Sequence, residues 1–145
     1  MNFARIAAAA VVAWVVAGII GYLVNGILLA DMFAQQPIYR AEADMNARLP
    51  VGFLFSLVGF FAFAYAYAKG YEGSNGVLEG LRFGVLIAVM INCFSIVWNY
   101  VTTPISVSMV AAFMVDYIVE WSIYGAIVGA IYKPLPTAAR RPAAV

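Results

Sequence analysis

Histidine is absent from the 145-residue sequence, cysteine occurs once, as Cys93, and charged residues make up only 10% of the chain. Without histidine, the chain cannot build a histidine-ligated haem site, a Glu-x-x-His di-iron site, a zincin-type zinc site or a Ser-His-Asp triad. A single cysteine cannot form an internal disulfide, which excludes thiol–disulfide oxidoreductases that work within one chain. Redox and metal chemistry carried by this chain alone are therefore not expected, and we predict no cofactor.

Charge is scarce and nearly balanced, with eight Lys and Arg residues against seven Asp and Glu residues. No basic run reaches the density that nucleic-acid binding needs, so nucleic acids are excluded as partners. Hydrophobic residues make up 66% of the chain, whereas soluble domains are about 45–50% apolar and about 25% charged. A chain with so little polar surface belongs in a lipid bilayer, and we predict an integral membrane protein.

Four apolar runs are long enough, at about 1.5 Å per residue of helix, to cross a hydrocarbon core of about 30 Å. They predict helices at residues 6–29, 51–68, 77–100 and 107–132. Because each run is apolar on every side, the alternating pattern of a β-barrel strand is ruled out. The predicted fold class is all-α: a polytopic, antiparallel bundle of four transmembrane helices in one domain, residues 1–133, followed by a tail with Pro and Arg, residues 134–145.

The positive residues predict the orientation of this bundle. With four spans, the two termini and the second connection share one side, and that side holds Arg5, Lys69, Arg82, Lys133, Arg140 and Arg141. The opposite side holds only Arg40 and Arg48. Both termini are therefore expected in the cytoplasm. The polar connection between the first two spans is expected outside, with a short surface helix within residues 39–49.

Glycines recur every fourth residue at the start of the third predicted helix and near the end of the fourth. They are Gly76, Gly80, Gly84, Gly125 and Gly129. Small residues at this spacing allow helix backbones to approach closely. Since the short connection at Pro104 makes these two helices neighbours, we expect the glycines to lie at their contact, with homo-oligomerisation through one face as the alternative.

Two acidic residues lie near the middle of the fourth predicted helix. Asp116 and Glu120 are one turn apart and so share a helix face. An ionisable side chain at that depth costs at least about 2.5 kcal/mol, so such residues are usually kept for a role. Two carboxylates this close in a low dielectric do not both stay ionised unless a cation compensates. We expect one of them to hold a proton.

Further polar residues are expected at the same depth as this pair or within its reach. The candidate set for a ligand, ion or proton site is Asp116, Glu120, Asn92, Arg82, Tyr22, Tyr117 and Tyr124. The alternatives are a structural network in which these groups hydrogen-bond to one another, and a docking surface for another membrane subunit. No nucleophile or substrate-positioning group accompanies the carboxyls, so an enzyme is not predicted.

The layout also resembles a known family. The first helix ends in Gly21-Tyr22-Leu23-Val24-Asn25-Gly26, a polar outer loop follows, the third helix begins at Gly76, and the last closes with Gly125-Ala126-Ile127-Val128-Gly129-Ala130. In these features the chain is similar to small bacterial four-helix integral membrane proteins of a domain-of-unknown-function family, number seventeen sixty-one. The resemblance implies four helices in a bacterial cytoplasmic membrane and implies no activity.

Two functional classes remain open at this point. One is a protein that binds or transports a small molecule, an ion or a proton, assembled as a homo-oligomer because four helices leave little room for alternating access. The other is an accessory structural subunit of a larger membrane complex. The lipid bilayer is a partner in both.

Overall fold

The computed structural model describes residues 1–134, and every regular element in that range is a helix. Four helical segments are long and apolar enough to cross a membrane: Phe3–Leu28, Glu42–Lys69, Gly76–Thr102 and Val107–Ile131. The prediction of an all-helical chain with four candidate spans is therefore confirmed. Apart from Pro134, the predicted tail with Arg140 and Arg141 lies outside the described residues.

The first span ends in a π-helical turn, and the third is interrupted by one. The first consists of α1 (Phe3–Leu23) and η1 (Val24–Leu28), and the third of α4 (Gly76–Ile91), η2 (Asn92–Ile96) and α5 (Val97–Thr102). The second and fourth are the single helices α3 (Glu42–Lys69) and α6 (Val107–Ile131), and the short helix α2 (Ala30–Ala34) follows η1. A π-turn widens the hydrogen-bond pattern locally, and such turns occur frequently at functional sites.

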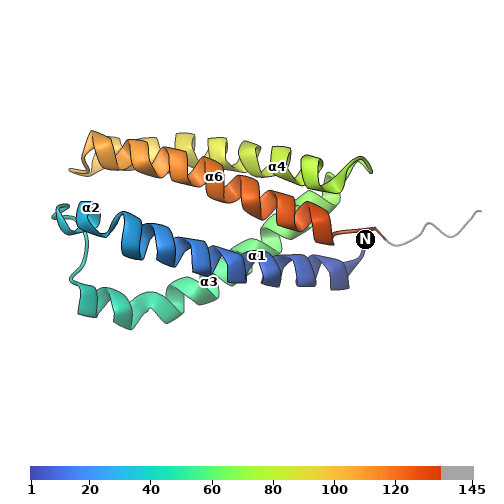
Figure 1. Ribbon diagram of the computed structural model, residues 1–145, viewed down its shortest axis with the longest axis horizontal. Coiled ribbons are helices and arrows are strands. Elements are labelled where there is room, and N and C mark those ends of the chain that lie inside the picture. Colours follow the sequence, from blue (N-terminus) through green and yellow to red (C-terminus); the bar gives the residue numbers. More distant parts are fainter. Residues whose placement is uncertain (135–145) are drawn as a thin grey trace, which may run out of the picture.

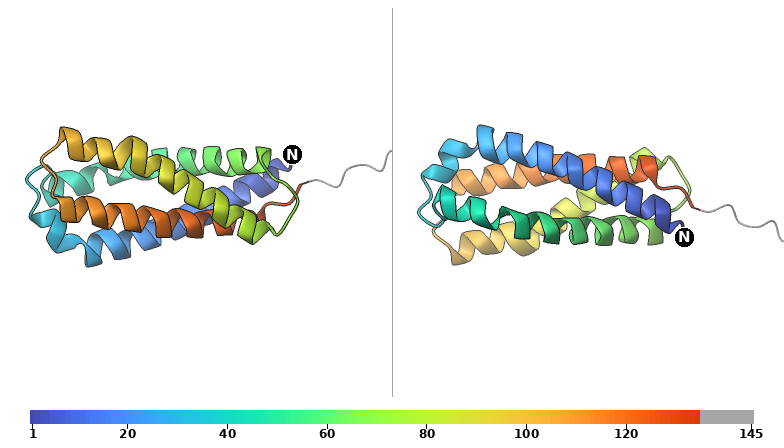
Figure 2. Two further views of the ribbon diagram at one scale, coloured as in Figure 1. Left: turned by 90° about the horizontal axis from the view of Figure 1, so that it is seen from above. Right: turned by 90° about the horizontal axis from the view of Figure 1, so that it is seen from below.

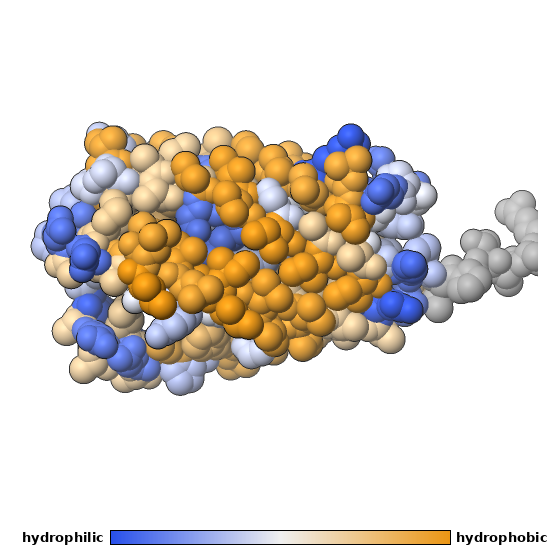
Figure 3. All heavy atoms as spheres, in the orientation of Figure 1, coloured by the Kyte–Doolittle hydropathy of each residue, from blue (hydrophilic) through white to orange (hydrophobic). Residues whose placement is uncertain are grey.

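The four spans lie side by side along the long axis of the molecule (Figure 1, Figure 2). The N-terminus and the end of α6 lie at the same end, where the Arg5 guanidinium donates to the Ile131 carbonyl oxygen at 3.4 Å. Hydrophobic residues cover most of the middle of the face seen in Figure 3, around a small hydrophilic patch, and further hydrophilic residues gather at its two ends. A hydrophobic band between polar ends is the surface that suits a bilayer.

Helix α3 begins at Glu42, well before residue 51, so residues 42–49 are its first turns and do not form the separate surface helix that was predicted. The Asp44 carboxylate accepts from Arg40 at 2.8 Å and from Arg48 at 2.5 Å, and these pairs across one turn stabilise the start of the helix. Pro50 lies inside the helix. Its missing N–H removes a single helical hydrogen bond near one end, so the helix continues through it.

Helices α4 and α6 form the most extensive helix–helix contact of the described chain. We call the five glycines at this contact the glycine seam: Gly76, Gly80, Gly84, Gly125 and Gly129. A Cβ atom added to Gly80 would lie 2.9 Å from the Gly125 carbonyl carbon and 3.0 Å from the Gly129 Cα. Each of the other seam glycines likewise faces backbone atoms of the opposite helix. Backbone therefore meets backbone, with no room for a side chain.

Large aromatic side chains fill the space between α3 and the α4–α6 pair. The Phe60 ring lies 6.0 Å from that of Trp121 and 5.2 Å from that of Tyr124, measured between centroids. The Phe63 ring lies 5.0 Å from that of Phe83 on α4. Glycines pack one face of α6 against α4, and large rings pack another face against α3. The rotation of α6 about its own axis is therefore fixed by two interfaces.

Candidate functional site

Helix α6 carries the two carboxyls that were predicted as a site. Glu120 is buried, with 8% of its surface exposed, and Asp116 is half-buried. The Oε1 atom of Glu120 has no hydrogen-bond partner, and neither carboxyl forms an ion pair with any residue in the range 1–134. A buried carboxyl that has no cation partner and one oxygen without a donor is costly unless it holds a proton or meets a ligand.

Tyr117 and Tyr124 share the α6 face of Glu120, because they lie one turn before it and one turn after it. Tyr124 is buried, and its ring packs 5.8 Å from that of Trp121. Tyr117 is half-buried, and its ring lies 6.4 Å from that of Phe113. The face of α6 that carries the carboxyls is thus flanked by a packed tyrosine on one side and a partly accessible one on the other.

The structure does not bring Arg82 to Glu120. Arg82 follows Gly80 by two residues, which is a rotation of about 200° on an α-helix, and Gly80 faces α6. Arg82 is exposed on the opposite side of α4 and forms no ion pair within the described chain. Arg82 therefore does not compensate the carboxyls, because the glycine seam turns the guanidinium away from α6.

Asn92 lies at the start of η2 and is buried. Its Nδ2 atom donates to the Met114 carbonyl oxygen at 3.1 Å, and its Oδ1 atom has no partner. Asp116 is two residues beyond Met114 and therefore points to another side of α6. Asn92 ties η2 to the α6 backbone and makes no hydrogen bond to either carboxyl among the residues described.

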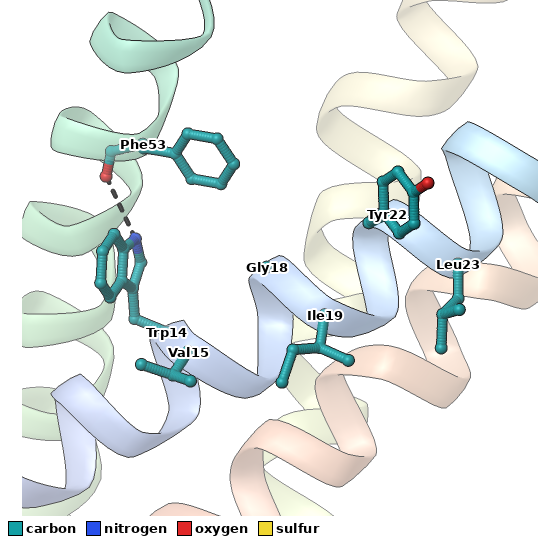
Figure 4. A pocket seen from close by; sticks show the side chains of 7 residues that line it. All are labelled: Trp14, Val15, Gly18, Ile19, Tyr22, Leu23 and Phe53. Carbon is teal, nitrogen blue, oxygen red and sulfur yellow. Dashed lines mark hydrogen bonds between the residues drawn. The ribbon is translucent and has the colours of Figure 1, made fainter.

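Tyr22 lies on the surface, with 68% of its area exposed. It borders an apolar groove of about 650 Å³ whose lining residues are Trp14, Val15, Gly18, Ile19, Tyr22, Leu23 and Phe53 (Figure 4). The Trp14 indole N–H at this groove donates to the Phe53 carbonyl oxygen at 3.1 Å and to Ser56 Oγ at 3.0 Å. An apolar groove whose polar atoms are paired has the character of a lipid-facing surface. Tyr22 lies at this surface and forms no hydrogen bond to the carboxyls of α6.

A second cavity, of about 370 Å³, lies where both π-turns approach the first half of α6, and we call it the π-turn cavity. Its polar lining residues are Asn25, Tyr39, Ser95, Asn99, Thr103 and Tyr117. Its apolar lining residues are Phe33, Ile38, Ile96, Ile105, Val110 and Phe113. No charged side chain lines it, and Tyr117 is the member of the predicted set that it includes.

The loop that carries Tyr39 is held in place at the start of α6. The Gln36 side chain donates from Nε2 to Ser106 Oγ at 3.1 Å and accepts the Ser106 N–H through Oε1 at 3.2 Å. The Tyr39 ring packs on Phe33 with centroids 4.8 Å apart. Burial raises the pKa of the Tyr39 hydroxyl above its ordinary value, so this group is neutral at physiological pH.

Most residues of the π-turn cavity were missed by the sequence reasoning. One signal was present, since Ser95, Asn99 and Thr103 recur every fourth residue and form a polar stripe on an otherwise apolar helix. Asn25 interrupts the first apolar run and lies in η1. The two π-turns that bring these residues to one cavity have no comparable signature in the sequence.

Comparisons of the chain with protein-family models, with curated proteins and with solved structures found no match. Within residues 1–134, no group of three or more His, Cys, Asp and Glu side chains is placed to hold a metal ion.

Proposed function

We propose that this chain is a multi-pass protein of the bacterial cytoplasmic membrane that binds a proton or a cation at Glu120 and Asp116. The observation that carries the proposal is the Glu120 carboxyl, which is buried, has an unpartnered Oε1 atom and has no ion-pair partner among the described residues. An ionised carboxyl in this position costs at least about 2.5 kcal/mol. Uptake of a proton or binding of a cation removes that cost.

The proposed arrangement is an antiparallel bundle with both termini in the cytoplasm. The distribution of positive residues supports this arrangement. Arg5 lies at the end of the molecule shared by the N-terminus and the end of α6. Arg40 lies just before α3, and Arg48 lies in its first turns. In this orientation the π-turn cavity lies in the outer half of the membrane. If the site serves transport, the transporting unit is a homo-oligomer, since four helices alone leave little room for alternating access.

Infrared spectroscopy of the purified protein in dodecyl maltoside tests the protonation of Glu120. At neutral pH we expect the carbonyl stretch of a protonated carboxyl, which is distinct from the stretches of a carboxylate, and we expect Glu120→Gln to abolish it. Glu42→Gln is the matched control, because Glu42 is exposed in the first turn of α3 and should not contribute to this band. A band that survives in Glu120→Gln would contradict the proposal.

The amide variants also distinguish a loss of titration at the two carboxyls from a loss of folding stability. Glu120→Gln and Asp116→Asn should melt like the wild type, because an amide satisfies much the same hydrogen bonds as a protonated carboxyl. Neither amide titrates, so the double variant should lose pH-dependent binding of a cation while it keeps its fold. Loss of the fold in the double variant would instead favour a purely structural network.

A further inference from the structure

Four aromatic rings that line the π-turn cavity follow one another in contact. The Phe33 ring lies 4.8 Å from that of Tyr39 and 5.7 Å from that of Phe113. The Phe113 ring in turn lies 6.4 Å from that of Tyr117. The rings come from three separate segments, namely α2, the loop after it, and α6. Rings from three segments around one cavity present π-surfaces to an occupant from several directions.

The electrostatics of the cavity favour a positive occupant. No Lys or Arg lines it. Neither carboxyl of α6 lines it either, but Asp116 is the residue before Tyr117 and lies about one turn after Phe113. The Asn99 amide donates to the Ser95 carbonyl oxygen at 3.1 Å, while no group of the described chain donates to its Oδ1 atom. Aromatic faces, an amide oxygen and nearby carboxyls all attract a cation.

We propose that the π-turn cavity binds an organic ammonium group, with Phe33, Tyr39, Phe113 and Tyr117 as its aromatic cage. The volume of about 370 Å³ lies within the range of about 300–1,000 Å³ that is usual for small-molecule sites. Hard inorganic cations need several oxygen ligands, whereas an alkylated ammonium binds against aromatic rings. This inference rests on the proposed function, since Asp116, the carboxyl of the pair that does not hold the proton, supplies the countercharge from beside the cavity.

Choline is the test ligand, and 3,3-dimethylbutan-1-ol, in which carbon replaces the ammonium nitrogen, is its uncharged control. Dodecyl maltoside micelles are used because they contain no ammonium group. Saturation-transfer nuclear magnetic resonance on the choline methyl protons gives the dissociation constant by titration, and ring currents should shift these protons upfield. We expect the uncharged analogue to bind about tenfold more weakly than choline, the size of a well-formed cation–π contact.

Ammonium groups occur in free amines and in lipid headgroups, and a second titration distinguishes these sources. Short-chain phosphatidylcholine is added below its micelle-forming concentration to the same sample. Binding of free choline supports a soluble ligand, and binding of the lipid alone supports a headgroup as the source of the ammonium. If neither binds, or if the uncharged analogue binds as tightly as choline, the ammonium site is refuted.

Two variants assign the binding to the cage. Phe113→Leu and Tyr39→Leu each remove a ring and keep an apolar side chain, and we expect each to weaken choline binding about tenfold. Tyr39 lies in a loop outside the four spans, so its variant should fold even where a substitution in α6 does not. Phe94→Leu is the matched control, because Phe94 is 74% exposed in η2 and does not line the cavity.

Equal weakening by Phe94→Leu and by the cage variants would overturn the assignment to this cavity. The infrared band of Glu120 is recorded on the same samples. A band that persists while choline fails to bind would place the failure at the cavity and leave the proposed function standing.

Discussion

Alanine in place of a seam glycine tests directly how α6 is held against α4. A Cβ atom at Gly80 would lie 2.9 Å from the Gly125 carbonyl carbon, and one at Gly125 would lie 2.9 Å from the Gly84 Cα. Carbon atoms are in favourable contact from about 3.5 Å, so the helices must separate by roughly 0.6 Å or more. The opposing atoms belong to helical backbone and cannot rotate away as a flexible side chain can.

The change in the free energy of unfolding that we expect for a seam alanine is the balance of two opposing effects. Overpacking of a close contact costs about 1–3 kcal/mol, while alanine in place of glycine in a helix gains about 0.5–1 kcal/mol. Gly59 in α3 isolates the second effect, because a Cβ atom there would meet nothing within 4 Å. The gain is common to all three variants, so we expect Gly80→Ala and Gly125→Ala to be less stable than Gly59→Ala by the overpacking cost, about 1–3 kcal/mol.

Reversible unfolding by sodium dodecyl sulfate in dodecyl maltoside micelles, followed by circular dichroism, gives the free energies. Stabilities of the seam variants equal to that of Gly59→Ala would refute the close contact between α4 and α6. The double variant Gly80→Ala/Gly125→Ala should cost less than the sum of the single variants. The two glycines touch each other, so one displacement of the helices relieves both overlaps.

Two further predictions concern the orientation of the chain and the contact of α1 with α3. A reporter that is active only in the cytoplasm should work when fused after Lys133 and fail when inserted at Glu42, and the reverse pattern would contradict the proposed orientation. Trp14→Phe removes the donor to Phe53 and Ser56, and should lower the free energy of unfolding by about 1 kcal/mol. Ser56→Ala keeps the bond to Phe53 and should cost less, so equal effects would show that this bond contributes little.

The sequence was sufficient to predict the four spans because their signal is long and redundant. Each apolar run is so long that one polar residue within it does not change the prediction of a span. In addition, the bilayer permits few structures other than a helix for such runs. The spacing of Gly80, Gly84, Gly125 and Gly129 likewise pointed to a close helix contact, since a face without side chains has few other uses in lipid. These features depend on local pattern alone.

Other features depend on rotation and register, which local pattern does not specify. Arg82 was included in the candidate set because its long side chain could reach toward Glu120, yet its position two residues from Gly80 places it on the far side of α4. The start of α3 was expected after Pro50, whereas the helix begins at Glu42 and continues through this proline with the loss of one hydrogen bond. Residues of the π-turn cavity come from both π-turns, from the loop after α2 and from α6, and the spacing within any one of these segments does not show that they meet.

The glycine seam also explains why Glu120 is buried away from α4. Gly125 faces α4, and Glu120 precedes it by five residues, which places its side chain about 140° around the helix. That direction leads away from α4 and into the bundle, where α1 also contacts α6. Ala9, Ala10 and Ala13 of α1 are fully buried and allow this helix to pack closely. Contacts between small residues thus set the rotation of α6, and that rotation keeps the carboxyl out of lipid.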